Sequence, residues 1–321
     1  MYLSVLTVPY SAKSLEETLA ILSKQGVQGV EIGTGGFPGN AHLNPAEIAA
    51  DPAKAAEILA LLKKYNMKIS ALSAHANPVH PDKAVAQTAH DEFIATCKAA
   101  QALGVNTVVT FSGCPGDSAA SKYPNWVTCA WPDDYTKILD YQWNEVLIPY
   151  WKSAVKEAAA YGVTKIALEM HPGFCVYNPG TLLRLRAAVG DAIGANFDPS
   201  HLYWQGINIP AAIKALKGAI HHFHAKDTKI DQRNTDVNGV LDSTSYEDLE
   251  NRSWVFRTIG YGHDMAEWKD IVSTLRVVGY EGAVSIEHED GMMSIDEGLR
   301  KAIAFLRDVI IFEEPAQMWW A

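Results

Sequence analysis

Short apolar runs and longer amphipathic segments alternate along the whole chain. The short runs are rich in Val, Ile, Leu and Ala, as strands buried on both faces of a parallel sheet are. The longer segments repeat apolar residues at helical spacing, with charged residues between them. We expect eight strands, at Tyr2–Val8, Val27–Ile32, Lys68–Ala74, Val105–Phe111, Val163–Met170, Ala195–Phe197, Ile220–Ala225 and Gly282–Ile286.

Each expected strand is followed by an expected helix. The helices are Ser11–Gln25, Pro52–Tyr65, Asp82–Leu103, Tyr135–Tyr161, Thr181–Val189, Ile209–Leu216, Asp264–Val278 and Ile295–Ile311. Ser14 is a suitable N-cap for the first helix, and Gly104 is a suitable end for the third. No linker or low-complexity segment divides the series. We therefore predict an α/β fold, a single (β/α)8 TIM barrel over residues 1–312 with a C-terminal tail at 313–321.

Two segments interrupt this regular alternation. Ser112–Asp133 and Asp227–Gly262 are long, and they contain Trp126, Trp131 and Trp254. Long loops that follow strands are commonly lids or binding loops. We expect both segments to cover the mouth of the barrel, and we expect a substrate larger than a free triose. The glycine-rich loop expected at 33–36 lacks the full GxGxxG spacing, so we do not interpret it as a nucleotide site.

Polar residues lie where four consecutive expected strands end. Glu169 and His224 lie at the ends of the fifth and seventh strands, and Asp198 and Glu287 follow the sixth and eighth. Active sites of such barrels lie at the carboxyl ends of the strands, so we expect these residues to share one divalent metal ion. Three carboxylates and one imidazole suit Mn²⁺ first, with Mg²⁺, Co²⁺ or Zn²⁺ as alternatives. For any one carboxylate, the alternative is a helix cap or a solvated charge.

Further candidates lie close to these residues. His171 is a candidate general base, because strand alternation puts it on the same side as Glu169. Glu31 is a candidate for contacts with substrate hydroxyls, whereas we assign His222 to packing. The candidate substrate-binding residues are His75, His201, Lys226, Arg257 and Trp126. Each has an ordinary alternative: a hydrogen-bonded histidine, a solvated lysine, an arginine paired with an acid, or a tryptophan packed in its own loop.

The composition narrows the class of protein. The formal net charge of the 321 residues is −10, which argues against a nucleic-acid partner. The four cysteines show no CxxC spacing and fit reduced thiols in a cytoplasmic enzyme. No apolar run approaches the roughly 20 residues of a membrane-spanning helix, and the first residues lack the basic region of a signal peptide. We expect a cytoplasmic protein with no membrane partner.

Several motifs resemble those of the xylose isomerase-like barrels, the sugar-phosphate isomerase and epimerase superfamily. They are ALEMHPG, NFDPSH, HFHAKD, IGYGHDMAEWKDIV and VSIEHED, and the resemblance extends over essentially the whole chain. It implies that His201 helps to bind substrate and that Lys226 lies near it. It also implies that the two glutamates of the metal site move the proton in keto-sugar epimerases. The residues that it implies as metal ligands are Glu169, Asp198, His224 and Glu287.

Two departures from this pattern matter. Relatives that repair abasic DNA need further histidines for three zinc ions, whereas this chain has Phe111 and Ser112 at the corresponding place on the fourth strand. The two long segments and His171 are similar instead to the larger subunit of bacterial C-glycoside deglycosidases. Those enzymes cleave 3-keto C-glycosides together with a small partner subunit.

These features predict a divalent-metal-dependent sugar isomerase or epimerase. We expect the ion to polarise the carbonyl of a (keto-)sugar, while Glu169, Glu287 or His171 removes the neighbouring proton to give an enediolate. Elimination of a β-substituent from a 3-keto glycoside, the deglycosidase reaction, shares this first step and stays open. A non-catalytic sugar-binding barrel is the alternative from another class.

The C-terminal tail ends in Met318, Trp319 and Trp320. Terminal residues are usually polar unless something holds them in place. The two tryptophans either fold back on their own barrel or dock on a second subunit. We expect a homo-oligomer, or a complex with a small partner subunit, that acts on a small sugar or glycoside.

Overall fold

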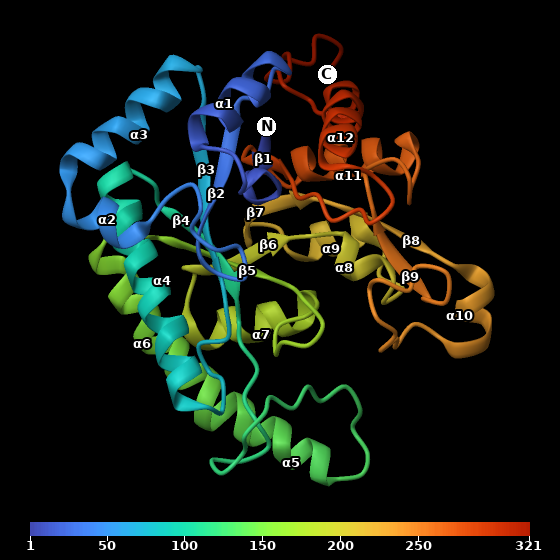
Figure 1. Ribbon diagram of the computed structural model, residues 1–321. Helices are drawn as coiled ribbons and strands as arrows, with labels where there is room; N and C mark the ends of the chain where they lie inside the picture. Colours follow the sequence, from blue (N-terminus) through green and yellow to red (C-terminus); the bar gives the residue numbers. More distant parts are fainter.

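The computed structural model describes residues 1–321 and shows a closed parallel barrel of eight strands surrounded by helices (Figure 1). The barrel closes where the last strand pairs in parallel with the first. The predicted (β/α)8 fold is therefore confirmed. The strands are β1 (Tyr2–Leu6), β2 (Gly29–Gly36), β3 (Lys68–His75), β4 (Thr107–Phe111), β5 (Lys165–Glu169), β6 (Ile193–Phe197), β7 (Ile220–Ala225) and β10 (Ala283–Ile286).

The helices cover the outside of the barrel, and their ends follow the expected capping chemistry. The Ser14 side chain accepts the backbone N–H of Glu17, whose carboxylate in turn accepts the backbone N–H of Ser14. Gly104 ends the third long helix in a left-handed conformation, as predicted. The helices are α1 (Leu15–Lys24), α2 (Pro45–Ala50), α3 (Pro52–Lys64), α4 (Lys83–Leu103), α5 (Asp134–Asp140), α6 (Ile148–Ala160), α7 (Pro179–Val189), α8 (Ser200–Tyr203), α9 (Ile209–Ala215), α10 (Gln232–Asn238), α11 (Met265–Val277) and α12 (Ile295–Val309).

Alternation along the strands sorts side chains into two layers. On β5, Ile166 and Leu168 belong to the large apolar core between strands and helices. Ala167 belongs instead to a separate small cluster with one residue each from β3 and β4. Because alternate side chains of a barrel strand point inward, this small cluster fills the barrel interior. Glu169, two residues after Ala167, is therefore delivered to the same interior at the carboxyl end of the strand.

The glycine-rich 33–36 stretch belongs to β2 rather than to a loop, so the expected boundary is wrong. Gly36 has a φ of +61°, and a Cβ atom there would lie 2.0 Å from the backbone oxygen of His75. Only glycine permits so close an approach. The extension of β2 thus runs beside the end of β3, where His75 faces the site.

The Asp227–Gly262 segment is not irregular, which corrects a second expectation. Asp227–Ile230 (β8) pairs antiparallel with Trp254–Arg257 (β9), and α10 lies between them in the chain. This unit lies at one side of the barrel in Figure 1. This pairing is hard to predict from sequence, because a long polar insertion separates the two strands. Ser112–Asp133 contains neither helix nor strand, as expected, and leads into α5.

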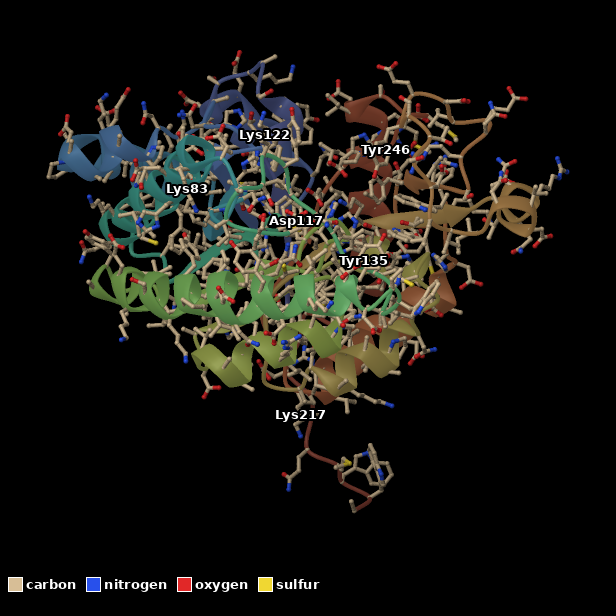
Figure 2. All side chains as sticks on the ribbon, turned by 90° about the horizontal axis from the view of Figure 1, so that it is seen from below. Lys83, Asp117, Lys122, Tyr135, Lys217 and Tyr246 are labelled. Atoms are coloured by element: carbon tan, nitrogen blue, oxygen red, sulfur yellow. The ribbon has the colours of Figure 1, made fainter.

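The C-terminal tail does not fold back on the barrel. Its last residues extend away from the body of the molecule (Figure 2), and the side chains of Trp319 and Trp320 are 88% and 70% exposed. The two rings contact each other edge to face. Docking of the tail on a second subunit stays a prediction. None of the helices is both long and apolar enough to cross a bilayer.

Candidate metal centre

Four side chains from successive barrel strands meet at the carboxyl end of the barrel. Glu169 and His224 belong to β5 and β7, and Asp198 and Glu287 directly follow β6 and β10. Each offers one ligand atom, and these atoms all lie within 4.8 Å of one another. Asp198 and His224 are fully buried, and Glu169 is nearly so. The structure thus brings together the whole set of residues that the sequence indicated as metal ligands.

Three side chains hold the Glu169 carboxylate by hydrogen bonds. His75 Nε2 and Asn196 Nδ2 each lie 3.0 Å from Oε2, and His201 Nε2 lies 3.0 Å from Oε1. Burial lowers the pKa of His201 to about 3, so its imidazole is neutral. Burial opposes ionisation of Glu169, but hydrogen bonds from His201, His224 and His75 outweigh it and hold the pKa of Glu169 well below its usual range. This carboxylate is therefore ionised and fixed in orientation.

Lys226 brings a positive charge into the cluster. Its Nζ lies 2.6 Å from Glu287 Oε2, 3.1 Å from Asp198 Oδ2 and 3.0 Å from Glu289 Oε2. Burial opposes the charged form, but the neighbouring carboxylates outweigh burial and hold the pKa of Lys226 well above its usual value. Burial also raises the pKa of Asp198 to about 7, against the effect of Lys226. At Glu287 burial acts in the same direction, but Lys226 and His224 outweigh it and lower the pKa to about 2.

The donor set fits a divalent cation. Three carboxylates and one imidazole form an oxygen-rich set of the kind that Mn²⁺ or Mg²⁺ prefers. Asp198 Oδ2 is buried and accepts no well-directed hydrogen bond, although Lys226 Nζ lies nearby. A buried carboxylate oxygen without a donor is costly, and a metal ion bound there removes that cost. The residues present are therefore suited to hold the ion that the sequence predicts.

A deeper carboxylate orients the imidazole of His224. Glu31 of β2 is completely buried, and both its oxygens lie within hydrogen-bond distance of His224 Nε2, at 3.0 and 2.9 Å. The Nε2–H of His224 donates to Glu31, and Nδ1 faces Glu169 and Glu287, at 3.4 and 3.1 Å. Burial opposes the charged form, but Glu31 and Glu287 outweigh it and hold the pKa of His224 well above its usual value, so an ion bound at Nδ1 would displace a proton. A carboxylate in this position commonly fixes the tautomer of a metal-binding histidine.

The positions of Glu31 and His222 correct two expectations. Glu31 is buried within the barrel and does not line the cavity, so it is not placed to contact substrate hydroxyls. His222 has a polar role besides packing, because its Nε2 lies 2.9 Å from Glu31 Oε2. Ser285 Oγ donates to the same carboxylate at 2.8 Å. The interior below the candidate metal centre is therefore a connected polar network.

A cavity of about 370 Å³ opens onto the cluster. His171 lines it, and His171 Nδ1 lies against the backbone oxygen of Pro172. Since Nδ1–H donates there, Nε2 is the nitrogen free to accept a proton. Burial lowers the pKa of His171, which keeps the ring neutral at neutral pH. The other polar lining residues are His75, Glu169, His201, Lys226, Glu287 and Glu289.

Two further cavities adjoin the first. One of about 380 Å³ shares His171 and His201 with it and is lined by Trp126 and Trp254 from the two long segments. The other, of about 420 Å³, shares His171 and Glu289 with the first. His171 therefore lies where three cavities meet. Both long segments reach the mouth of the barrel, as the sequence predicted.

Two of the other candidates lie elsewhere. Trp131 is 75% exposed and lines none of these three cavities. Arg257 does not line them either, and its Nε donates to Asp290 Oδ2 at 3.1 Å. This geometry favours the ion-pair interpretation of Arg257 over a direct substrate contact.

Comparison with known proteins gives the family. Residues 19–309 match the family model described as xylose isomerase-like TIM barrel, which is most of the chain. The chain belongs to the xylose isomerase-like TIM barrel family. It is also 40% identical over 312 residues to the uncharacterized protein YfiH of Bacillus subtilis (strain 168), with 97% of this chain and 99% of YfiH covered.

Solved structures share the fold of this xylose isomerase-like barrel at low identity. The IolI protein with a bound zinc atom has a TM-score of 0.66 and 21% identity, over 97% of this chain and 98% of IolI. The D-psicose 3-epimerase of Clostridium cellulolyticum H10, solved with D-tagatose, has a TM-score of 0.61 and 14% identity, over 97% and 99% of the two chains. At these identities, the likeness shows the fold.

Sequence reasoning missed several residues of this xylose isomerase-like barrel. Asn196 contacts Glu169, and Glu289 contacts Lys226. Each lies two positions from a predicted ligand, so strand alternation offered a signal for Asn196 on β6. Tyr246 lines the second cavity from within a polar insertion, where no periodicity indicates its direction.

Proposed function

We propose that this chain is a divalent-metal-dependent enzyme that removes a proton from the carbon beside a sugar carbonyl. The observation that carries this proposal is the convergence of four candidate ligands, two of which line the same cavity as a neutral histidine. The proposed ligands are Glu169, Asp198, His224 and Glu287, with Mn²⁺ as the first choice of ion. The family and the fold shared with a D-psicose 3-epimerase support a sugar as substrate. When bound, a divalent ion supplies Lewis-acid polarisation of the carbonyl.

The side chains around the cavity have distinct tasks in this proposal. His171 takes the proton at Nε2, the nitrogen that its contact with Pro172 leaves free. Lys226 holds a positive charge beside the cavity and stabilises negative charge on a substrate oxygen as the proton leaves. Glu287 and Glu169 line the same cavity as ionised carboxylates, and in this proposal one of them exchanges the second proton.

The fate of the proton decides the product. Returning it to the same carbon from the opposite face inverts that centre, and returning it to the former carbonyl carbon isomerises the sugar. A second candidate is elimination, in which the electron pair of the broken C–H bond forms a double bond and a β-substituent leaves with its own bonding pair. The two adjoining cavities favour this candidate, because they give room for a large leaving group. A 3-keto glycoside is the corresponding substrate, as in C-glycoside deglycosidases.

Hydrogen exchange with solvent tests the shared first step. We expect Mn²⁺-loaded protein in D₂O to place deuterium beside the carbonyl of at least one substrate in a panel of keto-hexoses and 3-keto glucosides, observed by NMR. Exchange should stop on chelation and return when Mn²⁺ is restored. Sugar binding without exchange across this panel would contradict the proposal and support a non-catalytic sugar-binding barrel.

Two histidine variants sharpen this test. His171→Asn should lower exchange strongly while Mn²⁺ binding stays intact, because it removes the proposed base and keeps the four ligands. His221→Asn is the matched control, since His221 lies at the opposite, amino-terminal end of β7. Equal deuterium exchange by both variants would show that His171 is not the base.

A further inference from the structure

The second cavity is built from aromatic side chains that the proposed proton transfer does not use. Its volume is about 380 Å³, and Trp126, Trp204, Tyr246 and Trp254 line it. Three separate parts of the chain contribute these rings: the 112–133 segment, the residue after α8 and the 227–262 segment. Rings gathered in this way form a site for a flat ligand with apolar faces.

One wall of this aromatic cavity is held in place by the protein itself. Trp254 stacks on Trp204, with ring centroids 4.7 Å apart and an interplanar angle of 5°. The buried guanidinium of Arg252 lies 4.6 Å from the Trp254 ring and 4.1 Å from the Tyr246 ring. Its Nε also donates to the backbone oxygen of Trp254 at 3.0 Å. The wall is therefore ordered before a ligand binds, which lowers the entropy lost on binding.

Two indole N–H groups at the aromatic cavity lack an acceptor. The Nε1 atoms of Trp126 and Trp204 are buried and have no hydrogen-bond partner in the protein. Trp254 differs, because its Nε1 donates to the backbone oxygen of Val240 at 3.0 Å. A buried N–H without an acceptor is unfavourable. Ligand oxygen atoms that come within reach of these N–H groups would supply the missing acceptors, whereas a purely hydrocarbon ring would not.

The aromatic cavity adjoins the cavity at the candidate metal centre. Both are lined by His171 and His201, whose ring centroids lie 4.1 Å apart. We propose that the aromatic cavity is a second subsite, which holds an oxygen-bearing aromatic ring covalently attached to the sugar at the metal centre. This inference rests on the proposed function and names its substrate class. The substrate is an aryl-substituted sugar rather than a free monosaccharide.

Binding of matched glycoside pairs tests the subsite. The probes are the 4-nitrophenyl and methyl glycosides of glucose, galactose and xylose, titrated calorimetrically into the Mn²⁺-loaded full-length protein. For at least one sugar we expect the 4-nitrophenyl glycoside to bind roughly tenfold more tightly than its methyl partner, since stacking and burial of one ring have that magnitude. Tryptophan fluorescence should change with the aryl probe and not with the methyl probe.

Variants locate the binding site of the ring. Trp126→Ala and Tyr246→Ala should each lower the preference for the aryl glycoside several-fold. Trp131→Ala is the matched control, because Trp131 lies in the same segment as Trp126 but is exposed and lines none of the three cavities. The control should retain the full preference.

Three results would overturn the subsite. They are equal binding of aryl and methyl glycosides, no binding of any aryl probe, and an aryl preference that survives both cavity variants. Deuterium exchange into free keto-sugars is scored separately. Deuterium exchange without an aryl preference would contradict the subsite and support the proposed function. An aryl preference without deuterium exchange would support the subsite and contradict the proposed function.

Discussion

The candidate metal centre and the aromatic cavity beside it are held in place by different means. Barrel strands deliver the four candidate ligands, and buried polar groups such as Glu31 and Asn196 fix two of them by hydrogen bonds. The aromatic rings lie outside the barrel strands, where ring stacking and Arg252 hold them. We therefore expect the proposed reaction and the choice of substrate to be separable. Substitutions in the aromatic wall can change the ligand while the metal centre stays intact.

The largest expected effect is loss of a proposed metal ligand. Glu287→Gln keeps the shape of the side chain but removes one charged oxygen donor. We expect Mn²⁺ affinity to fall at least about 100-fold. Substituting a residue that only hydrogen-bonds to a metal ligand already lowers metal affinity roughly 10- to 100-fold, and loss of a ligand itself should cost more. The gain in melting temperature that Mn²⁺ gives the wild-type protein should disappear. Calorimetric titration and thermal unfolding measure both quantities, and an unchanged Mn²⁺ affinity would remove Glu287 from the site.

A smaller loss of Mn²⁺ affinity is expected from a change at Glu31, which contacts the candidate ligand His224. Glu31→Gln removes the charge that orients His224, and we expect Mn²⁺ affinity to fall roughly 10-fold to 100-fold. Ser285→Ala is the control, because it removes a donor to the same carboxylate and leaves the Glu31–His224 contact in place. Circular dichroism confirms that each variant folds. Equal losses in the two variants would indicate general damage to the buried network rather than orientation of His224.

A change in the aromatic wall should alter the preference for aryl glycosides and leave Mn²⁺ affinity unchanged. Arg252→Met fills similar space but removes the guanidinium between Tyr246 and Trp254. We expect the preference for aryl glycosides to fall several-fold, since a cation held against a ring contributes about 0.5–2 kcal/mol. Mn²⁺ affinity should match the wild type within error. A parallel loss of Mn²⁺ affinity would show that wall and metal centre are coupled after all.

The smallest expected effect on the fold comes from the tail. Deleting residues 318–321 removes two exposed tryptophans, so the free energy of unfolding should change by no more than about 0.5 kcal/mol. If the tail docks on a second subunit, the molar mass in solution should fall. Light scattering on the full chain and the truncated chain decides this. An unchanged oligomer with intact activity would exclude the tail as an interface.

The sequence was informative where strand geometry fixes the direction of a side chain. Glu169 and His224 end apolar runs, so the alternation of a buried strand and the polarity of a barrel place them at one end. The same logic failed for Glu31, whose buried position depends on partners such as His222 and Ser73, far away in the chain. Spacing along one strand does not reveal such partners.

The long segments were less predictable for a related physical reason. The antiparallel pairing of β8 with β9 depends on contacts across a polar insertion, and neither strand has a distinctive pattern alone. The local pattern of the 112–133 segment does not set Trp126 apart from Trp131, and only tertiary packing decides which ring lines a cavity and which is exposed. Composition identifies the candidates, and the fold selects among them.

A Mn²⁺ titration of the metal-free protein, in which electron paramagnetic resonance measures the free ion, tests the proposed metal centre. We predict one tight Mn²⁺ site per chain in the wild-type protein and in Trp126→Ala. We predict no tight site in Asp198→Asn, because that change removes a charged oxygen from the four converging ligands. Absence of tight binding by the wild-type protein, or equally tight binding by Asp198→Asn, would contradict the proposed metal centre.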